Sequence, residues 1–261
     1  MALSWSKGLR DFVAVHGSYK RALQGGQLEI RTGSAPATAD AAVTGTLLCT
    51  VTKASGARTK EALGRGCVTL AGSGGSVDSI LVNGVDILGA AVAWDTDLTT
   101  TAANVAEQIN SYQPIRGPKY MATSIGAVIT IIMLYGTGTA GNGTAGTIVS
   151  SVTTMTSTDV SIGGTAGTGT NGANGLEFSG CTNGVLGKGT AAWSGVNVAT
   201  GVAGYFRLIS SVNDGGTAGT TEVRVQGVCG ISSGDYPMTS TTLTSGQTHT
   251  VDAFSLTLPA A

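Results

Sequence analysis

From Gly175 to the C-terminus, short apolar or alternating segments recur with glycine and asparagine between them. Segments bounded by turn residues at roughly ten-residue spacing are typical of antiparallel strands, and their number predicts a sandwich or barrel. Trp193, Tyr205, Phe206 and Phe254 are the large side chains suited to fill its core. The segments are GLEFSGC, GVLGKG, AAWSGVNV, AGYFRLISSV, TTEVRVQGVCG and HTVDAFSLTLP.

The N-terminal part predicts a helix and two strands. Apolar residues recur at helical spacing from Ser6 to Leu23, and His16 lies on the same stripe. Gly17 interrupts the pattern and could divide it into two short helices, and Gly25-Gly26 supplies a stop. QLEIRTG and TLLCTVT then have strand character, with the loop GSAPATADAAVTG between them.

The middle of the chain predicts a small α+β module. In SILVNGVDIL, Asn83-Gly84 between apolar runs indicates a hairpin, because a type I′ turn needs positive φ at both positions. The segment DLTTTAANVAEQINSY predicts a helix, with its threonines available as the cap and Pro114 as the end. KYMATSI and AVITIIMLY predict two strands joined at Ile125-Gly126, and a Thr/Ser/Val-rich run to Ser161 follows the glycines. The predicted order is β-β-α-β-β-β.

These patterns predict a mainly β chain of two domains. Residues 1–60 and 173–261 form a split antiparallel β-sandwich with a short N-terminal helix, and residues 66–171 form the inserted α+β module. The stretch TAGTGTNGANG, from Thr165 to Gly175, is the expected hinge.

Glycines after the apolar run Ala127–Tyr135 match G-x-G-x-x-G at Gly136, at Gly141 and again at Gly167. A dinucleotide site needs such a turn to open a helix and an acidic residue about twenty positions later. The following TIVSSVTTMTST favours a strand, so the spacing of Asp159 is coincidental, and no Gly-Lys-Ser/Thr marks a P-loop. We therefore expect a flexible loop between strands.

Composition favours a subunit that buries surface in an assembly. Only 11% of the 261 residues are charged, 41 are glycine, and the mean hydropathy is +0.23. The net charge of −1 gives no footprint for nucleic acid. Five cations lie in the first 31 residues; an acidic partner could use them, but a solvated helix face is the simpler interpretation. They are Lys7, Arg10, Lys20, Arg21 and Arg31.

The cysteines and the apolar segments predict neither a metal site nor a membrane segment. Cys49, Cys67, Cys181 and Cys229 lack metal-ligand spacing and lie far from both histidines, so zinc is not expected and buried free thiols are the default. The opening MALSWSKGLRDF has no secretory pattern. The longest apolar run is far shorter than the roughly twenty residues a membrane helix needs, so no membrane contact is expected.

No residue set predicts catalysis, a cofactor or a metal. A Ser/His/Asp triad would need His16 or His249. Asp95-Thr96-Asp97 could suggest calcium, but turn or cap duty is the simpler role. No two carboxylates stand out as a pair for glycoside hydrolysis. Those considered are Asp78, Asp86, Asp95, Asp97, Glu107, Asp214, Glu222 and Asp235.

Two stretches carry a resemblance to proteins of tailed bacteriophages. The opening LRDFVAVHGSYKRALQGGQLEIRTG…TLLCTVT and the closing GLEFSGC…AFSLTLPA resemble the two halves of a family of small virion proteins. The intervening VNGVDI, TTAANVAEQIN, YMATSIGAVITI and GTAGNGT resemble a module of phage tail and tail-sheath proteins. The resemblance implies a virion structural role, assembled in the host cytoplasm, and carries over no functional residues.

Two functions from different classes follow as expectations. The first is a capsid decoration (cement) or head-neck protein that self-associates and docks on other virion subunits. The second is a tail, baseplate or fibre component that binds a host receptor or carbohydrate, for which Trp94 with Asp95 and Asp97, or Tyr236, are the candidate contacts. A wall-hydrolysing enzyme is a distant third.

Overall fold

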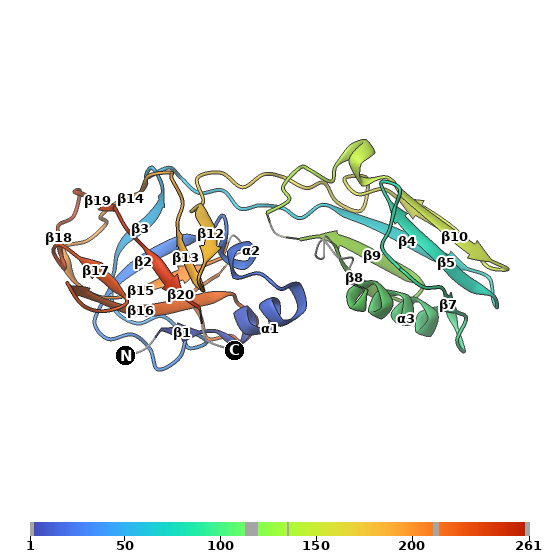
Figure 1. The fold of residues 1–261 in the computed structure, drawn as a ribbon, viewed down its shortest axis with the longest axis horizontal. Coiled ribbons are helices and arrows are strands. Elements are labelled where there is room, and N and C mark those ends of the chain that lie inside the picture. The colour runs from blue at the N-terminus through green and yellow to red at the C-terminus, as the bar shows by residue number, and fades with distance from the viewer. Residues whose placement is uncertain (1–2, 113–119, 135, 211–213, 259–261) are drawn as a thin grey trace. The chain divides into compact units, whose positions relative to one another are not determined.

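The computed structural model describes residues 3–112, 120–134, 136–210 and 214–258 (Figure 1). The chain divides into two compact units. The first comprises Met1–Lys60 and Gly172–Ala261, and the second comprises Glu61–Asn171. The second unit thus begins at Glu61, where the sequence analysis placed the start at residue 66. The chain is mainly β, as predicted.

A large sheet and a small sheet enclose the core of the first unit. Residues from both sheets, among them Leu28, Phe206, Phe178 and Leu186, form one apolar cluster, which gives the predicted sandwich-like arrangement. The large sheet runs in the spatial order β1 (Ser4–Trp5), β16 (Arg224–Ile231), β15 (Gly201–Ile209), β2 (Gln27–Thr32), β3 (Leu47–Lys53), β14 (Trp193–Val196) and β19 (Thr248–Val251), with β17 (Tyr236–Met238) on β16 and β18 (Thr242–Leu243) on β15. The small sheet contains β12 (Phe178–Thr182), β13 (Val185–Lys188) and β20 (Ser255–Thr257).

Gly17 does divide the N-terminal helix. Helix α1 (Lys7–His16) ends at Gly17, which adopts the left-handed conformation with φ of 68°, and α2 (Tyr19–Leu23) follows. Ser6 and Ser18 cap the two helices by accepting hydrogen bonds from the backbone amides of Leu9 and Arg21. The side chain of His16 lies outside the described residues.

Sequence analysis missed or merged several strands of the first unit. It did not predict β1, β17 or β18, because two or three residues are too few to show a period. It treated HTVDAFSLTLP as one strand, whereas β19 and β20 lie in different sheets. Trp193, Phe206 and Phe254 fill the core as predicted, but Tyr205 faces the other side of the large sheet, where its hydroxyl donates to the carbonyl of Thr44 at 2.7 Å.

The second unit contains two four-stranded sheets and more strands than predicted. One sheet holds β10 (Ile148–Thr153), β5 (Ser76–Val82), β6 (Val85–Asp86) and β7 (Val92–Ala93); the other holds β11 (Thr156–Val160), β4 (Arg65–Ala71), β9 (Val128–Met133) and β8 (Tyr120–Ile125). The order β-β-α-β-β-β is therefore wrong in strand number. The sequence analysis missed β4, and TIVSSVTTMTST forms two strands because the chain turns at Thr154, whose φ is 71°.

Local signals in the second unit were mostly correct. Asn83 and Gly84 have φ of 50° and 76°, as the predicted hairpin requires. Helix α3 (Leu98–Ser111) forms, but its cap is Asp97 and not a threonine, because the Asp97 carboxylate accepts from the Thr100 amide at 2.7 Å. Tyr112 caps its C-terminal end, and Pro114 lies outside the described residues.

Helix α3 also closes the free edge of β8. The Asn110 side-chain amide donates to the carbonyl of Ala122 at 2.8 Å, and the Ala122 amide donates back to Asn110 Oδ1 at the same distance. This pair of bonds imitates a neighbouring strand, so the outward backbone groups of Ala122 are satisfied where the sheet ends.

Gly204 provides a direct test of close backbone packing. It is the extra residue of the bulge where β15 shifts register against β2, and a Cβ there would lie 1.9 Å from the carbonyl oxygen of Gly33. We expect Gly204→Ala to lower the free energy of unfolding by about 2–3 kcal/mol, since the two strands must separate. The control is Gly180→Ala, whose added methyl meets no atom within 4 Å. Equal urea-denaturation midpoints for the two variants would contradict this account.

Candidate functional site

The first glycine motif binds a carboxylate of its own unit. The backbone amides of Gly136 and Gly138 both donate to the carboxylate of Glu61, the former at 2.7 Å. Both glycines have positive φ, and their amides, two residues apart, point toward one acceptor. The motif therefore does present an anion-binding backbone, and Glu61 occupies it.

The other two glycine motifs pack against each other. The Asn142 side-chain amide donates to the carbonyl of Gly169 at 2.7 Å and accepts from its backbone amide at 2.9 Å. A Cβ at Gly169 would lie 2.3 Å from the carbonyl oxygen of Gly138. The first motif is followed by η1 (Gly143–Gly146), a single turn of 3-10 helix within the second motif, and the second motif is followed by strand β10, so neither opens an α-helix that could receive a pyrophosphate. The loop that we expected to be flexible is thus tied by hydrogen bonds within its own unit.

Asp159, at the spacing of a ribose ligand, has a structural partner. Its carboxylate accepts from the backbone amide of Ser150 at 2.7 Å and from the Ser150 hydroxyl at 2.6 Å. It thereby joins β11 to the outer edge of β10, and the hydroxyl of Ser161 bonds the Ile148 amide of the same edge.

Trp94, Asp95 and Asp97 are engaged at the start of α3. Trp94 packs against the apolar core of the second unit. Asp97 caps the helix, and the hydrogen bond from the Thr100 amide lowers the pKa of its carboxyl. Asp95 accepts from Thr96 and Asn104. Asp95 and Asp97 therefore form a turn and a helix cap, which is the simpler of the roles considered for them.

Other carboxylates considered for catalysis also bind neighbouring groups. Asp78 accepts from Ser76 and Thr153, and these bonds lower its pKa. Asp86 accepts from the backbone amides of Leu88 and Gly89 in the bend that follows β6, and Asp235 accepts from the amide of Val228.

His249 and Tyr236 form a contact inside the first unit. The Tyr236 hydroxyl lies 2.8 Å from His249 Nε2, and the Tyr236 ring packs edge-on against Phe206 and Phe254. Burial lowers the pKa of His249, while the charge of Asp252 opposes this shift. Tyr236 is only 3% exposed, so it cannot serve as the exposed ring of a receptor site.

The cysteines are free, but only in part buried. Burial raises the pKa of Cys49 to about 11 and that of Cys229 to about 12, which leaves both as unreactive thiols at neutral pH. Cys181 is exposed, contrary to the expected burial, because it lies at the outward end of β12 beside the hairpin turn to β13.

Most N-terminal cations do lie at the surface, with one clear exception. Lys7 pairs with Asp11 at 2.8 Å in an exposed i,i+4 bridge, and Arg10 and Lys20 are exposed. Arg31 is not a solvated helix cation: it lies on β2, mostly buried, and its guanidinium binds Glu29 at 2.9 Å.

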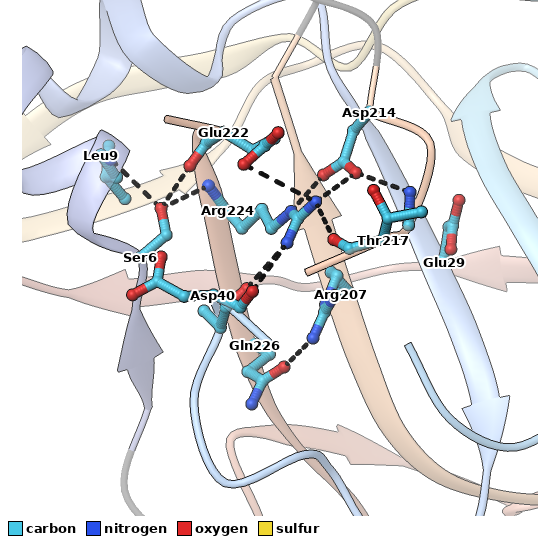
Figure 2. Close-up of polar contacts among 12 residues, drawn as sticks. Ser6, Leu9, Glu29, Asp40, Arg207, Asp214, Thr217, Glu222, Arg224 and Gln226 are labelled. Carbon is cyan, nitrogen blue, oxygen red and sulfur yellow. Dashed lines mark hydrogen bonds and ion pairs between the residues drawn. The ribbon is translucent and has the colours of Figure 1, made fainter. Parts of the chain in front are cut away.

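The most developed polar cluster lies beneath the loop between β2 and β3. Figure 2 shows Arg207 of β15 and Arg224 and Gln226 of β16 at its centre, side by side in the sheet. Arg224 makes a two-point ion pair with Asp214, and both side chains are at most 6% exposed. Ser6 joins helix α1 to this cluster, because its hydroxyl accepts from the amides of both Leu9 and Arg224.

These side chains bind the loop by its backbone. Arg207 donates to the carbonyl of Ala41 at 2.9 Å, Gln226 to that of Pro36 at 2.6 Å, and Arg224 to those of Ala39 and Asp40. Arg207 also donates to Gln226 Oε1 at 2.6 Å. Burial and the neighbouring Arg224 both lower the pKa of Arg207. The loop is thus fixed over the polar face of the sheet.

Sequence reasoning did not single out this cluster. The available signal was alternation: YFRLI and EVRVQGV each place arginine between apolar residues of a strand that the analysis assigned to the core. A charged residue at such a position requires buried partners.

The described surface includes one open hollow in the first unit. It has a volume of about 420 Å³ and is lined by α2, β12 and β13, with Lys20, Gln24, Phe178 and Lys188 among its residues. Several of its polar groups already have partners: Gln24 accepts from the amide of Phe178, and Lys188 donates to the carbonyl of Ala191.

Within residues 3–258, apart from the gaps named above, no group of three or more His, Cys, Asp or Glu side chains could hold a metal ion. In the same residues, no helix is long and apolar enough to cross a bilayer. No protein-family model matches the chain, and no curated protein or solved structure is significantly similar to it.

Removing one partner from the arginine cluster should lower the free energy of unfolding by a large amount. Replacing Arg224 by Met leaves the buried Asp214 carboxylate without its counter-charge, so we expect a loss of about 3–5 kcal/mol in the free energy of unfolding. Lys7→Met breaks an exposed ion pair and should change stability little. Chemical denaturation of both variants checks this, and a small loss for Arg224→Met would show that the cluster does not hold the loop.

His249 predicts a dependence of stability on pH. Its folded pKa lies below the unfolded value near 6.5, so the unfolded chain binds more protons once the pH falls through about 6.5. The stabilisation is therefore complete above this pH and declines below it. We expect the stability difference between the wild type and His249→Gln to shrink between pH 7.5 and pH 5, measured by urea denaturation. A difference that is constant with pH would contradict the assignment.

Proposed function

We propose that this chain is a structural component of a tailed phage virion, a capsid decoration or head-neck protein that self-associates and docks on other virion subunits. The observation that carries the proposal is that the polar groups considered for a functional site are used in contacts inside the protein. The candidate side chains and glycine amides bind other parts of the same unit: Glu61 fills the glycine loop, Asp97 caps a helix, and His249 binds Tyr236.

Composition and resemblance support the same function. A chain with 11% charged residues offers little charged surface to solvent, and a mainly β chain provides sheet faces and edges for contacts between subunits. The resemblance of the first unit to small phage virion proteins, and of the second to a tail module, supports a role in the particle.

The protein content of purified particles tests this function. We expect mass spectrometry to find the chain in phage particles, at near parity with the major capsid protein if it decorates the head and at a few copies if it belongs to the neck. The proposal fails if the chain is absent from particles, and the head and neck assignment fails if antibody labels only the tail.

Receptor or carbohydrate binding is the competing function. Of its candidate contacts, Tyr236 is buried and Trp94 packs on the core, whereas the open hollow near Lys20 and Lys188 could accept such a ligand. Binding of the full chain to a glycan array would favour this function, and loss of that binding in Lys188→Ala would locate it in the hollow.

A further inference from the structure

Strand β19 ends the large sheet of the first unit (Figure 1), and one of its two edges has no neighbouring strand. The Asn197 amide donates to the carbonyl of Gln247, and Gly195 lies opposite His249. In an antiparallel pair, alternate residues bond across the ladder. His249 and Val251 therefore bond toward β14, and the backbone groups of Thr248 and Thr250 point away from the sheet.

This edge differs from two others in the protein. Asn110 bonds the outer backbone of β8, and Asp159 and Ser161 bond that of β10. Among the described residues, no hydrogen bond to the outward backbone groups of Thr248 or Thr250 is found. Proteins usually protect such an edge with lysine, proline or a covering segment, and β19 contains neither residue.

The surface beside the outer edge of β19 is suited to pairing with another strand like β19. Thr248 and Thr250 are exposed, and Val196, opposite Thr248 on β14, is 50% exposed. Val198 continues this surface and is 62% exposed. Strand β19 carries no Lys, Arg, Asp or Glu, so a partner strand meets no fixed charge along it.

We propose that β19 pairs antiparallel with β19 of a second copy of this chain, on a twofold axis through His249. In this register Thr248 lies opposite Thr250 of the second copy, and Thr250 opposite its Thr248. Each of these pairs exchanges two backbone hydrogen bonds, so all four outward groups on each edge find partners.

The sequence around β19 favours this self-pairing. Threonine pairs across antiparallel strands are favourable. The same register places Asp252 opposite Gly246, which has no side chain, so the two Asp252 carboxylates do not face each other. The inference deepens the self-association in the proposed function and rests on it only for its biological use.

Thr250→Pro tests the interface with little disturbance inside the chain. Its backbone amide points outward, and proline is tolerated at such positions of edge strands. The variant removes two hydrogen bonds from the dimer, one per copy, and we expect dimerisation to weaken roughly thirty-fold. The control Thr250→Val keeps the amide and should dimerise like the wild type. Sedimentation equilibrium of the full chains gives the constants, and thermal unfolding verifies that each variant is folded.

Paired charges test the register. The double variant T248K/T250E places opposite charges across the axis in both pairs, whereas T248K/T250K places like charges there. We expect T248K/T250E to dimerise at least tenfold more tightly than T248K/T250K at low salt, with the difference reduced by added salt.

The outcomes separate this inference from the virion proposal. A wild-type chain that stays monomeric up to about 1 mM, or a Thr250→Pro variant that dimerises like the wild type, overturns the β19 interface. Equal affinities for the two charge variants overturn the register. None of these results depends on whether purified particles contain the chain, which tests the virion role by itself.

Discussion

Two buried guanidinium groups hold the first unit in its observed form. Arg207 and Arg224 lie on adjacent strands, with Arg207 opposite Gln226, and both donate to the backbone of the loop between β2 and β3. Figure 2 shows the contact of Arg224 with Asp40 of this loop. A loop of this kind carries many backbone carbonyls that need partners once water is excluded. Asp214 supplies the counter-charge for Arg224, and Ser6 attaches the first helix to the same place. The sheet, the loop and the helix therefore depend on one cluster.

In the second unit, side chains bond the unpaired backbone groups at the edges of the sheets. Asn110 imitates a strand beside β8, and Asp159 bonds the outer edge of β10. The glycine loops follow the same rule, because Glu61 and Asn142 accept from amides that would otherwise lack partners. Residues that a motif search would assign to ligands serve the backbone here. This use explains why a Gly-rich, weakly charged chain can still form ordered loops.

Local sequence patterns predicted most of the helices, strands and turns, but not the contacts between them. Gly17 and Asn83-Gly84 were recognised because positive φ is required within a few residues of the signal. Strand β4 was missed although its buried residues alternate and glycines follow it, whereas the division of β10 from β11 was missed because no glycine marks the turn at Thr154. The polar partners could not be predicted, because Glu61 and Gly136 are separated by 75 residues, and Arg207 and Ala41 by 166.

The sequence by itself determined the mainly β class, the approximate bounds of the two units and most of the turns, because these follow from periodicity and from backbone conformations set by neighbouring residues. Only the tertiary structure decided which sheet each strand joins, that Tyr205 faces away from the core, and that Arg207 and Arg224 are buried. These outcomes depend on hydrogen bonds and ion pairs between residues far apart in the chain. No local pattern specifies such pairs, because a buried polar group is stable only beside the partner that the complete fold brings to it.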